Sequence, residues 1–276
     1  MPDASDFVLT ALGDHAYRGA VPAHWTFEGR AFGGFTAALT LAAVLADQAR
    51  PALTSAHIAF LEPGQVGPVE IAVDAMRSGR SAAVVRATAT QEGRPILLAT
   101  AWLVDAWSTE AHTPMPDPFP PAPIGEGPED WRRAPVGPSI GWLAEAWQML
   151  TFAERRSIDY PTSWDGFARG RPEIALWSRL VDPLLVPFGQ LVDVLYLDAH
   201  LFDAPAQMTG FEGLAMLSLD LSIAWQPGSS LVAAEAWRRI ESRGAVTGGG
   251  VSSYATVTAD HGELLAVATS QGLIRR

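Results

Sequence analysis

The chain has 276 residues, of which 48% are hydrophobic, and a formal net charge of −11 at pH 7. This apolar content is enough for a substantial buried core and excludes wholesale disorder, whereas the negative charge opposes binding to nucleic acid phosphates. There is no cysteine, and every cation is an arginine, which excludes disulfides, thiol nucleophiles, Schiff bases and phosphate loops that need a lysine.

The sequence predicts a soluble cytoplasmic protein without a membrane partner. Residues 1–30 include Asp3, Asp6 and Asp14 and lack the basic start and apolar run of a secretory signal. The longest apolar stretch, residues 35–46, is interrupted by threonines and is too short to cross a bilayer. The six histidines are scattered without the spacing of metal ligands, so we expect no metal and no cofactor.

The first half predicts one buried helix followed by four strands. Residues 35–50 (FTAALTLAAVLADQAR) begin after two glycines, end before Pro51 and are apolar on almost every side, as expected of a helix surrounded by protein. Strand-like runs separated by Gly- and Pro-containing turns follow at 57–61, 69–76, 81–91 and 96–104. A helix followed by a four-stranded antiparallel meander is a compact α+β unit.

The middle of the chain predicts a connection between two domains. Nine prolines between Pro114 and Pro138 oppose regular structure there. Residues 139–150 (SIGWLAEAWQML) then predict a helix and residues 174–180 a strand. We therefore expect an N-terminal domain at 1–108, a proline-rich linker at 109–138 and a C-terminal domain at 139–276.

The second half repeats the first in the same order. AFGGFTAALTLAAVLAD (31–47) matches PFGQLVDVLYLDAHLFD (187–203), and HIAFLEPG (57–64) matches LSIAWQPG (221–228). GRPILLAT (93–100) then matches GELLAVAT (262–269). The alternative interpretation is that any two α+β segments share apolar runs and glycine turns.

These segments resemble the type II acyl-CoA thioesterase family, whose members are double hotdogs. The resemblance depends on FGG before the helix, on HIAFLEPG with RSGRS and QEGRPILLATA, and on SLDLSIAW with GELLAVATSQGLIR. It implies an α+β double hotdog, in which two antiparallel sheets, each wrapped around a central helix, join edge to edge. It also implies an acyl-CoA substrate, with its acyl chain in a groove at the junction, hydrolysed by a water held by an aspartate, a hydroxyl residue and a glutamine.

Asp220 is the candidate base, at the family's position in S-[IL]-D-x-S. We expect a strand here with an apolar face of Leu217, Leu219, Leu221, Ile223 and Trp225. Asp220 then shares the other face with Ser218, Ser222 and Ala224, which are small and leave room for a ligand. Burial would raise the pKa of this carboxyl toward neutrality, which suits a general base. The alternative is an acid that faces solvent on a half-exposed strand.

The family's hydroxyl and glutamine do not match this sequence cleanly. Ser242 is the nearest hydroxyl in the strand after Asp220, one place from the expected position, and Thr247 lies just beyond it. In the last strand, SQGLIR, Ser270 occupies the glutamine position and Gln271 follows it. Since neighbouring strand residues point to opposite faces, a regular strand would place Ser270 in the site, and a bulge would place Gln271 there.

Candidate substrate-binding residues surround these positions. Three glycines at helix starts present N–H groups that could polarise a thioester oxygen, or they simply allow close packing: Gly33, Gly34 and Gly189. Arg77 and Arg80 flank a tight turn and could contact CoA phosphates, although arginines at hairpin tips are often only solvated. His57, in the first HIAFLEPG segment, is a further candidate.

Two other functions stay open. The mismatched hydroxyl and glutamine allow a non-catalytic acyl-CoA-binding protein. An enoyl-CoA hydratase would need a paired Asp and His, but Asp198 and His200 are two residues apart on a helix and thus on different faces. Because open sheet edges are prone to pairing, we also expect a homo-oligomer.

Overall fold

The structure, a computed structural model, describes residues 4–27, 29–48, 50–105, 127–130, 152–156, 173–182, 188–209 and 215–275. The helix predicted at 139–150 and nearly all of the linker predicted at 109–138 lie outside these residues. Among the described residues, no helix combines the length and apolar character needed to span a bilayer.

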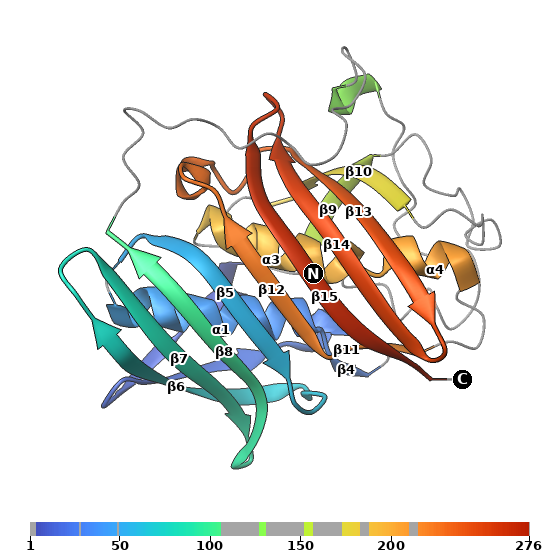
Figure 1. The fold of residues 1–276 in the computed structure, drawn as a ribbon. Helices are drawn as coiled ribbons and strands as arrows, with labels where there is room; N and C mark the ends of the chain where they lie inside the picture. Colours follow the sequence, from blue (N-terminus) through green and yellow to red (C-terminus); the bar gives the residue numbers. More distant parts are fainter. Residues whose placement is uncertain are drawn as a thin grey trace.

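The first half contains one long helix, α1, followed by four strands (Figure 1). Its elements are η1 (Ala4–Phe7), β1 (Thr10–Gly13), β2 (Ala16–Val21), η2 (Ala23–Trp25), β3 (Thr26–Phe27), β4 (Arg30–Ala31), α1 (Gly33–Gln48), β5 (Ala52–Phe60), β6 (Gly67–Ser78), β7 (Ala82–Gln91) and β8 (Arg94–Val104). The helix and the four predicted strands are present with shifted ends, whereas β1 to β4 were not predicted.

The rest of the chain repeats this order of a helix and then strands. Its elements are η3 (Pro128–Asp130), β9 (Ala153–Arg156), β10 (Glu173–Leu180), α3 (Gly189–His200), α4 (Asp203–Thr209), β11 (Ala215–Ser218), β12 (Asp220–Trp225), η7 (Ser229–Leu231), β13 (Arg238–Thr247), β14 (Gly250–Ala259) and β15 (Leu264–Arg275). The single strand predicted across residues 217–225 is interrupted at Leu219.

Apart from β3 and β4, which pair only with each other, the strands form one continuous antiparallel sheet rather than the two sheets expected from the sequence. The order is β1-β2-β6-β7-β8-β5-β12-β15-β14-β13-β10-β9, and β11 also pairs with β15. The halves join where β5 pairs with β12, for example at His57 opposite Ser222. This pairing satisfies the backbone groups that would otherwise be exposed at the edge of each half, so the join removes two open edges.

The expected meander is wrong in one respect. β6, β7 and β8 are consecutive neighbours, but β5 pairs with β8 and with β12 instead of β6. The turn signals in the sequence identify the two tight hairpins correctly. They carry no information on the longer β5–β6 connection, which places β6 between β7 and β2.

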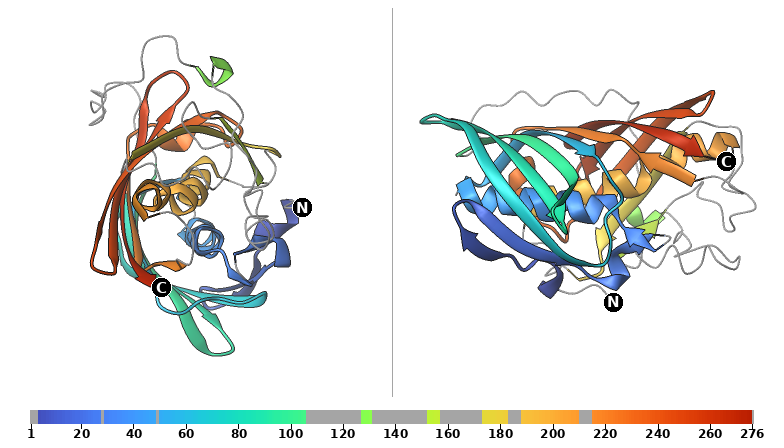
Figure 2. Two further views of the ribbon diagram at one scale, coloured as in Figure 1. Left: turned by 90° about the vertical axis from the view of Figure 1, so that its right-hand side faces the viewer. Right: turned by 90° about the horizontal axis from the view of Figure 1, so that it is seen from below.

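Both helices lie against the concave side of the curved sheet (Figure 2). Every residue of α1 from Gly34 to Leu45 is buried, and Phe35 and Val194 are both 0% exposed. α1 contacts β6, β7 and β8, α3 contacts β12, β13 and β14, and the two helices contact each other. This confirms the prediction that each helix is buried against the strands of its own half.

A buried ion pair holds α3 in the second half. Arg238 Nε donates to Asp193 Oδ1 at 2.7 Å, and both side chains are 0% exposed. The Trp225 indole donates to the other carboxylate oxygen at 3.0 Å. Burial raises the pKa of the Asp193 carboxyl, although Arg238 opposes the shift. Removing either partner would leave an uncompensated charge in the core and would destabilise the fold. We therefore assign this pair a structural role and not a role in a functional site.

Candidate active site

The start of α1 meets the end of α3. The Gly34 N–H donates to Asp198 Oδ2 at 2.6 Å, and the Ser218 hydroxyl donates to Asp198 Oδ1 at 3.3 Å. Asp198 is surrounded by protein but keeps part of its surface exposed, as do Gly33 and Ser218. Burial raises the pKa of the Asp198 carboxyl to about 6, while its two hydrogen bonds favour the ionised form. The expectation that Gly34 presents an unpaired N–H is therefore wrong.

The two glycines at this helix start are required by close contact. A Cβ on Gly33 would lie 3.0 Å from Asp198 Oδ2, and a Cβ on Gly34 would lie 2.6 Å from Phe32 Cζ. Since residues without a side chain let another group approach the backbone, Gly33 and Gly34 allow the carboxylate to reach the helix end. Gly189 at the start of α3 has a packing role, because a Cβ there would lie 2.1 Å from the Val232 carbonyl oxygen.

A β-bulge separates β11 from β12. Ser218 pairs with Gly272 but Ser222 pairs with Thr269, so one strand has an extra residue between these pairs. Leu219 lies in the bulge, where its N–H donates to the Gln271 carbonyl at 2.8 Å, and its side chain is 42% exposed. The predicted faces are wrong at this point because the bulge reverses the alternation: Leu219 leaves the apolar face, and Ser218 contacts Asp198.

Asp220 follows directly and is held by the last strand. Its Oδ1 accepts the Gln271 backbone N–H at 2.7 Å, and the Ser270 hydroxyl donates to the Asp220 carbonyl at 2.5 Å. Ser270 is buried and Gln271 is exposed, so their side chains lie on opposite faces of the sheet. Asp220 is partly exposed, and strand alternation with buried Leu221 places it on the outer face, where Gln271 also lies.

The two other candidate hydroxyls lie away from Asp220. Ser242 is in β13, two strands beyond the β15 partner of β12, where its buried hydroxyl donates to the His200 carbonyl at 3.2 Å. Thr247 is exposed at the end of β13, opposite Gly250. The structure thus brings Ser270 and Gln271 to Asp220, and leaves Ser242 and Thr247 elsewhere.

The candidate binding residues are also dispersed. His57 is exposed on β5, where its Nδ1 lies 2.7 Å from the Ser222 hydroxyl, two pairs along from Asp220. Arg77 and Arg80 are exposed around the β6–β7 turn. Arg50, just beyond the end of α1, donates to the Gly79 carbonyl in that turn at 2.7 Å, so these arginines lie near the end of α1 and not near its start.

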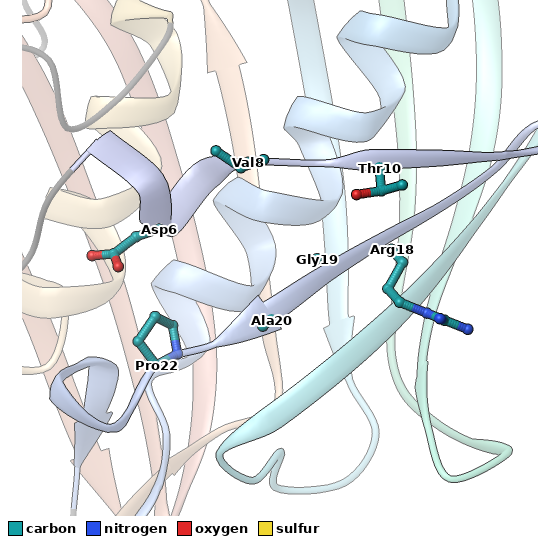
Figure 3. A pocket seen from close by; sticks show the side chains of 7 residues that line it. All are labelled: Asp6, Val8, Thr10, Arg18, Gly19, Ala20 and Pro22. Atoms are coloured by element: carbon teal, nitrogen blue, oxygen red, sulfur yellow. The ribbon is translucent and has the colours of Figure 1, made fainter.

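The described residues also contain an open pocket of about 450 Å³ on the first half, between the η1–β1 segment and β2 (Figure 3). Asp6 and Arg18 are at its two ends, and both are engaged in the protein. Asp6 accepts hydrogen bonds from His24 and Trp25, and Arg18 pairs with Glu70. This pocket lies apart from the junction. Among the described residues there is also no cluster of three His, Asp or Glu side chains that could hold a metal ion.

Comparison with known proteins gives a match to one family model in the first half of the chain. Residues 21–104 match the sequence model of the acyl-CoA thioesterase N-terminal domain. The resemblance to acyl-CoA thioesterases is confirmed. No curated protein matches the chain.

Solved structures match over almost the full length. A conserved protein with a hot dog fold from Alicyclobacillus acidocaldarius is 20% identical, with a TM-score of 0.77, over 99% of this chain and 97% of that chain. Acyl-CoA thioesterase II TesB2 from Mycobacterium marinum is 23% identical, with a TM-score of 0.71, over 98% and 97%. The tesB protein from Mycobacterium avium subspecies paratuberculosis is 20% identical, with a TM-score of 0.72, over 98% and 97%. These structures establish the hotdog fold, and the family match supports a thioester hydrolase.

The acyl-CoA thioesterase resemblance makes one asymmetry between the repeats informative. Asp198 corresponds to Ala42 in the matched helix segments, and Asp220 and Ala56 are the residues directly before the matched segments 221–228 and 57–64. The repeat makes the start of α3 equivalent to the start of α1. Only the start of α1 therefore has these carboxylates, because the equivalent residues of the first half are alanines. In the sequence, Asp198 stands out only as a possible partner of His200. The available signal was an acid at a position where the first repeat has alanine in a buried helix.

Proposed function

We propose that the protein hydrolyses acyl-CoA thioesters, with a water molecule activated by Asp220. The observation that supports this proposal is that one carboxylate oxygen of Asp220 is held by a hydrogen bond directly after the bulge between β11 and β12. Among the described residues, its second oxygen has no hydrogen-bond partner in the structure. A carboxylate that is fixed, partly exposed and free at one oxygen can accept a proton from an attacking water.

The proposed reaction is a direct displacement. The water oxygen forms a bond to the thioester carbonyl carbon while Asp220 accepts a water proton. The carbon–sulfur bond then breaks, and the CoA thiolate leaves and takes up a proton. Gln271 is the better candidate for orienting the water, because its side chain lies on the same face as Asp220 and its amide both donates and accepts. Ser270, on the buried face, supports the Asp220 backbone instead.

An isotope experiment tests this mechanism. A single turnover of octanoyl-CoA in ¹⁸O-water, with enzyme in excess, should place ¹⁸O in the octanoate product during the first turnover. If Asp220 attacked the carbonyl itself and water then cleaved the resulting mixed anhydride at the Asp220 carbon, the first octanoate would take its new oxygen from the carboxylate and would carry ¹⁶O. Absence of CoA release from octanoyl-, acetyl- and palmitoyl-CoA, measured with a thiol reagent, would contradict the proposed function as a whole.

One observation favours a second candidate, a non-catalytic acyl-CoA-binding protein. Ser242 and Thr247 lie away from Asp220, so neither candidate for the hydroxyl that the family resemblance implies reaches the site. Calorimetric binding of octanoyl-CoA without CoA release would support this alternative. The geometry does not support an enoyl-CoA hydratase, because Asp198 and His200 do not pair with each other. Asp198 bonds Gly34 and Ser218, whereas His200 bonds Asp203 at 2.9 Å.

A further inference from the structure

Asp198 links two segments from different halves of the chain, the start of α1 and the end of β11. One of its oxygens accepts the Gly34 N–H at the start of α1, and the other accepts the hydroxyl of Ser218. Ser218 is the last residue of β11 and is separated from Asp220 only by Leu219. One side chain of α3 therefore contacts both the helix start and the strand end that leads into the bulge.

A second link closes the same corner. The Phe60 N–H at the end of β5 donates to the Leu219 carbonyl at 2.9 Å. The Phe60 ring lies against the same helix start, since a Cβ on Gly33 would be 3.0 Å from its Cε1 atom. The end of β5 therefore contacts both the bulge and the helix start, and Asp198 is the ionisable group that also links these two segments.

We propose that Asp198 is a positioning residue of the hydrolytic site, which fixes the Asp220 bulge relative to the start of α1. This inference rests on the proposed function, because it assigns Asp198 a role in the geometry of Asp220. Small displacements of a reacting group cause large losses of rate, so Asp198, which bonds the residue two positions before Asp220, can control turnover without touching the substrate.

The charge of Asp198 is part of this role. The groups that face it are Gly33 and Gly34 from α1, Phe60 from β5 and Ser218 from β11, and none of them is ionisable. The positive end of the α1 dipole and two hydrogen-bond donors stabilise the ionised form, while burial disfavours it. Protonation would weaken both hydrogen bonds at once, and the bulge would then lose one of its attachments.

This role differs from that of a simple helix cap. A cap needs only an acceptor for the Gly34 N–H, and an asparagine would serve as well at every pH. A positioning role that depends on charge predicts that Asp198→Asn keeps the fold but loses part of the pH dependence of turnover. Asp198→Ala, which removes the acceptor, should affect turnover more strongly.

The test is the pH profile of kcat and KM for octanoyl-CoA with wild type, Asp198→Asn, Asp198→Ala and Ser218→Ala. We expect Asp198→Ala to lower kcat by roughly tenfold to a hundredfold with a smaller change in KM. We expect Asp198→Asn to recover most of that loss and to remove a decline of kcat near pH 6. Ser218→Ala keeps the Gly34 contact and should lower kcat by a smaller factor, so it serves if Asp198→Ala fails to fold. Asp47→Asn, at the other end of α1, is the matched control.

Each outcome is decisive. An active wild type whose kcat and pH profile are the same in Asp198→Asn and Ser218→Ala would overturn this inference alone. A folded wild type that releases no CoA would overturn the proposed function, and this inference with it. Loss of kcat in Asp47→Asn equal to that in Asp198→Ala would show a general effect of removing an acid from these helices and would also overturn the inference.

Discussion

The Asp198 carboxylate lies 2.6 Å from the Gly34 amide nitrogen, so a side chain of the second half ends the helix of the first half. Their separation along the chain means that this contact exists only when both halves are folded and docked. Burial at this position raises the pKa of the Asp198 carboxyl to about 6, although the hydrogen bond from Gly34 favours the ionised form. Fold stability and pH dependence are therefore coupled at this position.

Stability should fall with rising pH because of Asp198. The pKa of its carboxyl is raised from 3.8 to about 6, so the folded protein binds this proton more tightly than the unfolded chain. The stabilising contribution is fully present below about pH 4 and is lost as pH rises through about 6. Because Asp198 is partly exposed, we expect a change of about 1–3 kcal/mol.

Urea unfolding of wild type and Asp198→Asn from pH 4 to 7 measures this effect. The free energy of unfolding of Asp198→Asn minus that of wild type should increase over this range, since the asparagine has no proton to lose. The difference between the two proteins cancels the titration of other groups. A constant difference across the range would show that the Asp198 pKa is not raised in the folded protein.

Gly34→Ala should destabilise the protein although Gly34 lies in a helix. The added Cβ would lie 2.6 Å from Phe32 Cζ and 3.0 Å from Asp198 Cβ, and relieving this overlap costs about 1–3 kcal/mol. The gain from replacing glycine by alanine in a helix is at most about 1 kcal/mol. Gly250→Ala is the matched control, because its Cβ would lie no closer than 3.6 Å to any other group. Thermal unfolding in which Gly34→Ala is more stable than wild type would contradict the packing described here.

Sequence patterns predicted most of the secondary structure in the described residues because they depend on local periodicity. The apolar character of residues 35–46 identified α1, and the glycine-containing turns identified the β6–β7–β8 hairpins. The position of β5 between β8 and β12 could not be predicted in this way. It depends on pairing between residues far apart in the sequence, such as His57 and Ser222.

The candidate site was less predictable, for a different reason. A single extra residue near Leu219 decides which side chains face the interior, and the free energy that separates a bulge from a regular strand is not visible in a short segment. The contact of Asp198 with Gly34 likewise depends on how two helices dock. Roles for Asp220, Ser270 and Gln271 remain predictions that the following experiment addresses.

Asp220→Asn tests the central claim most directly. The substitution keeps the shape of the side chain and an oxygen that can accept the Gln271 N–H, but it removes the base. We expect kcat for octanoyl-CoA hydrolysis to fall roughly a hundredfold or more with an unchanged melting temperature, while Asp74→Asn, on an exposed acid of β6, keeps wild-type turnover. Wild-type kcat in Asp220→Asn would contradict the account and exclude Asp220 as the base.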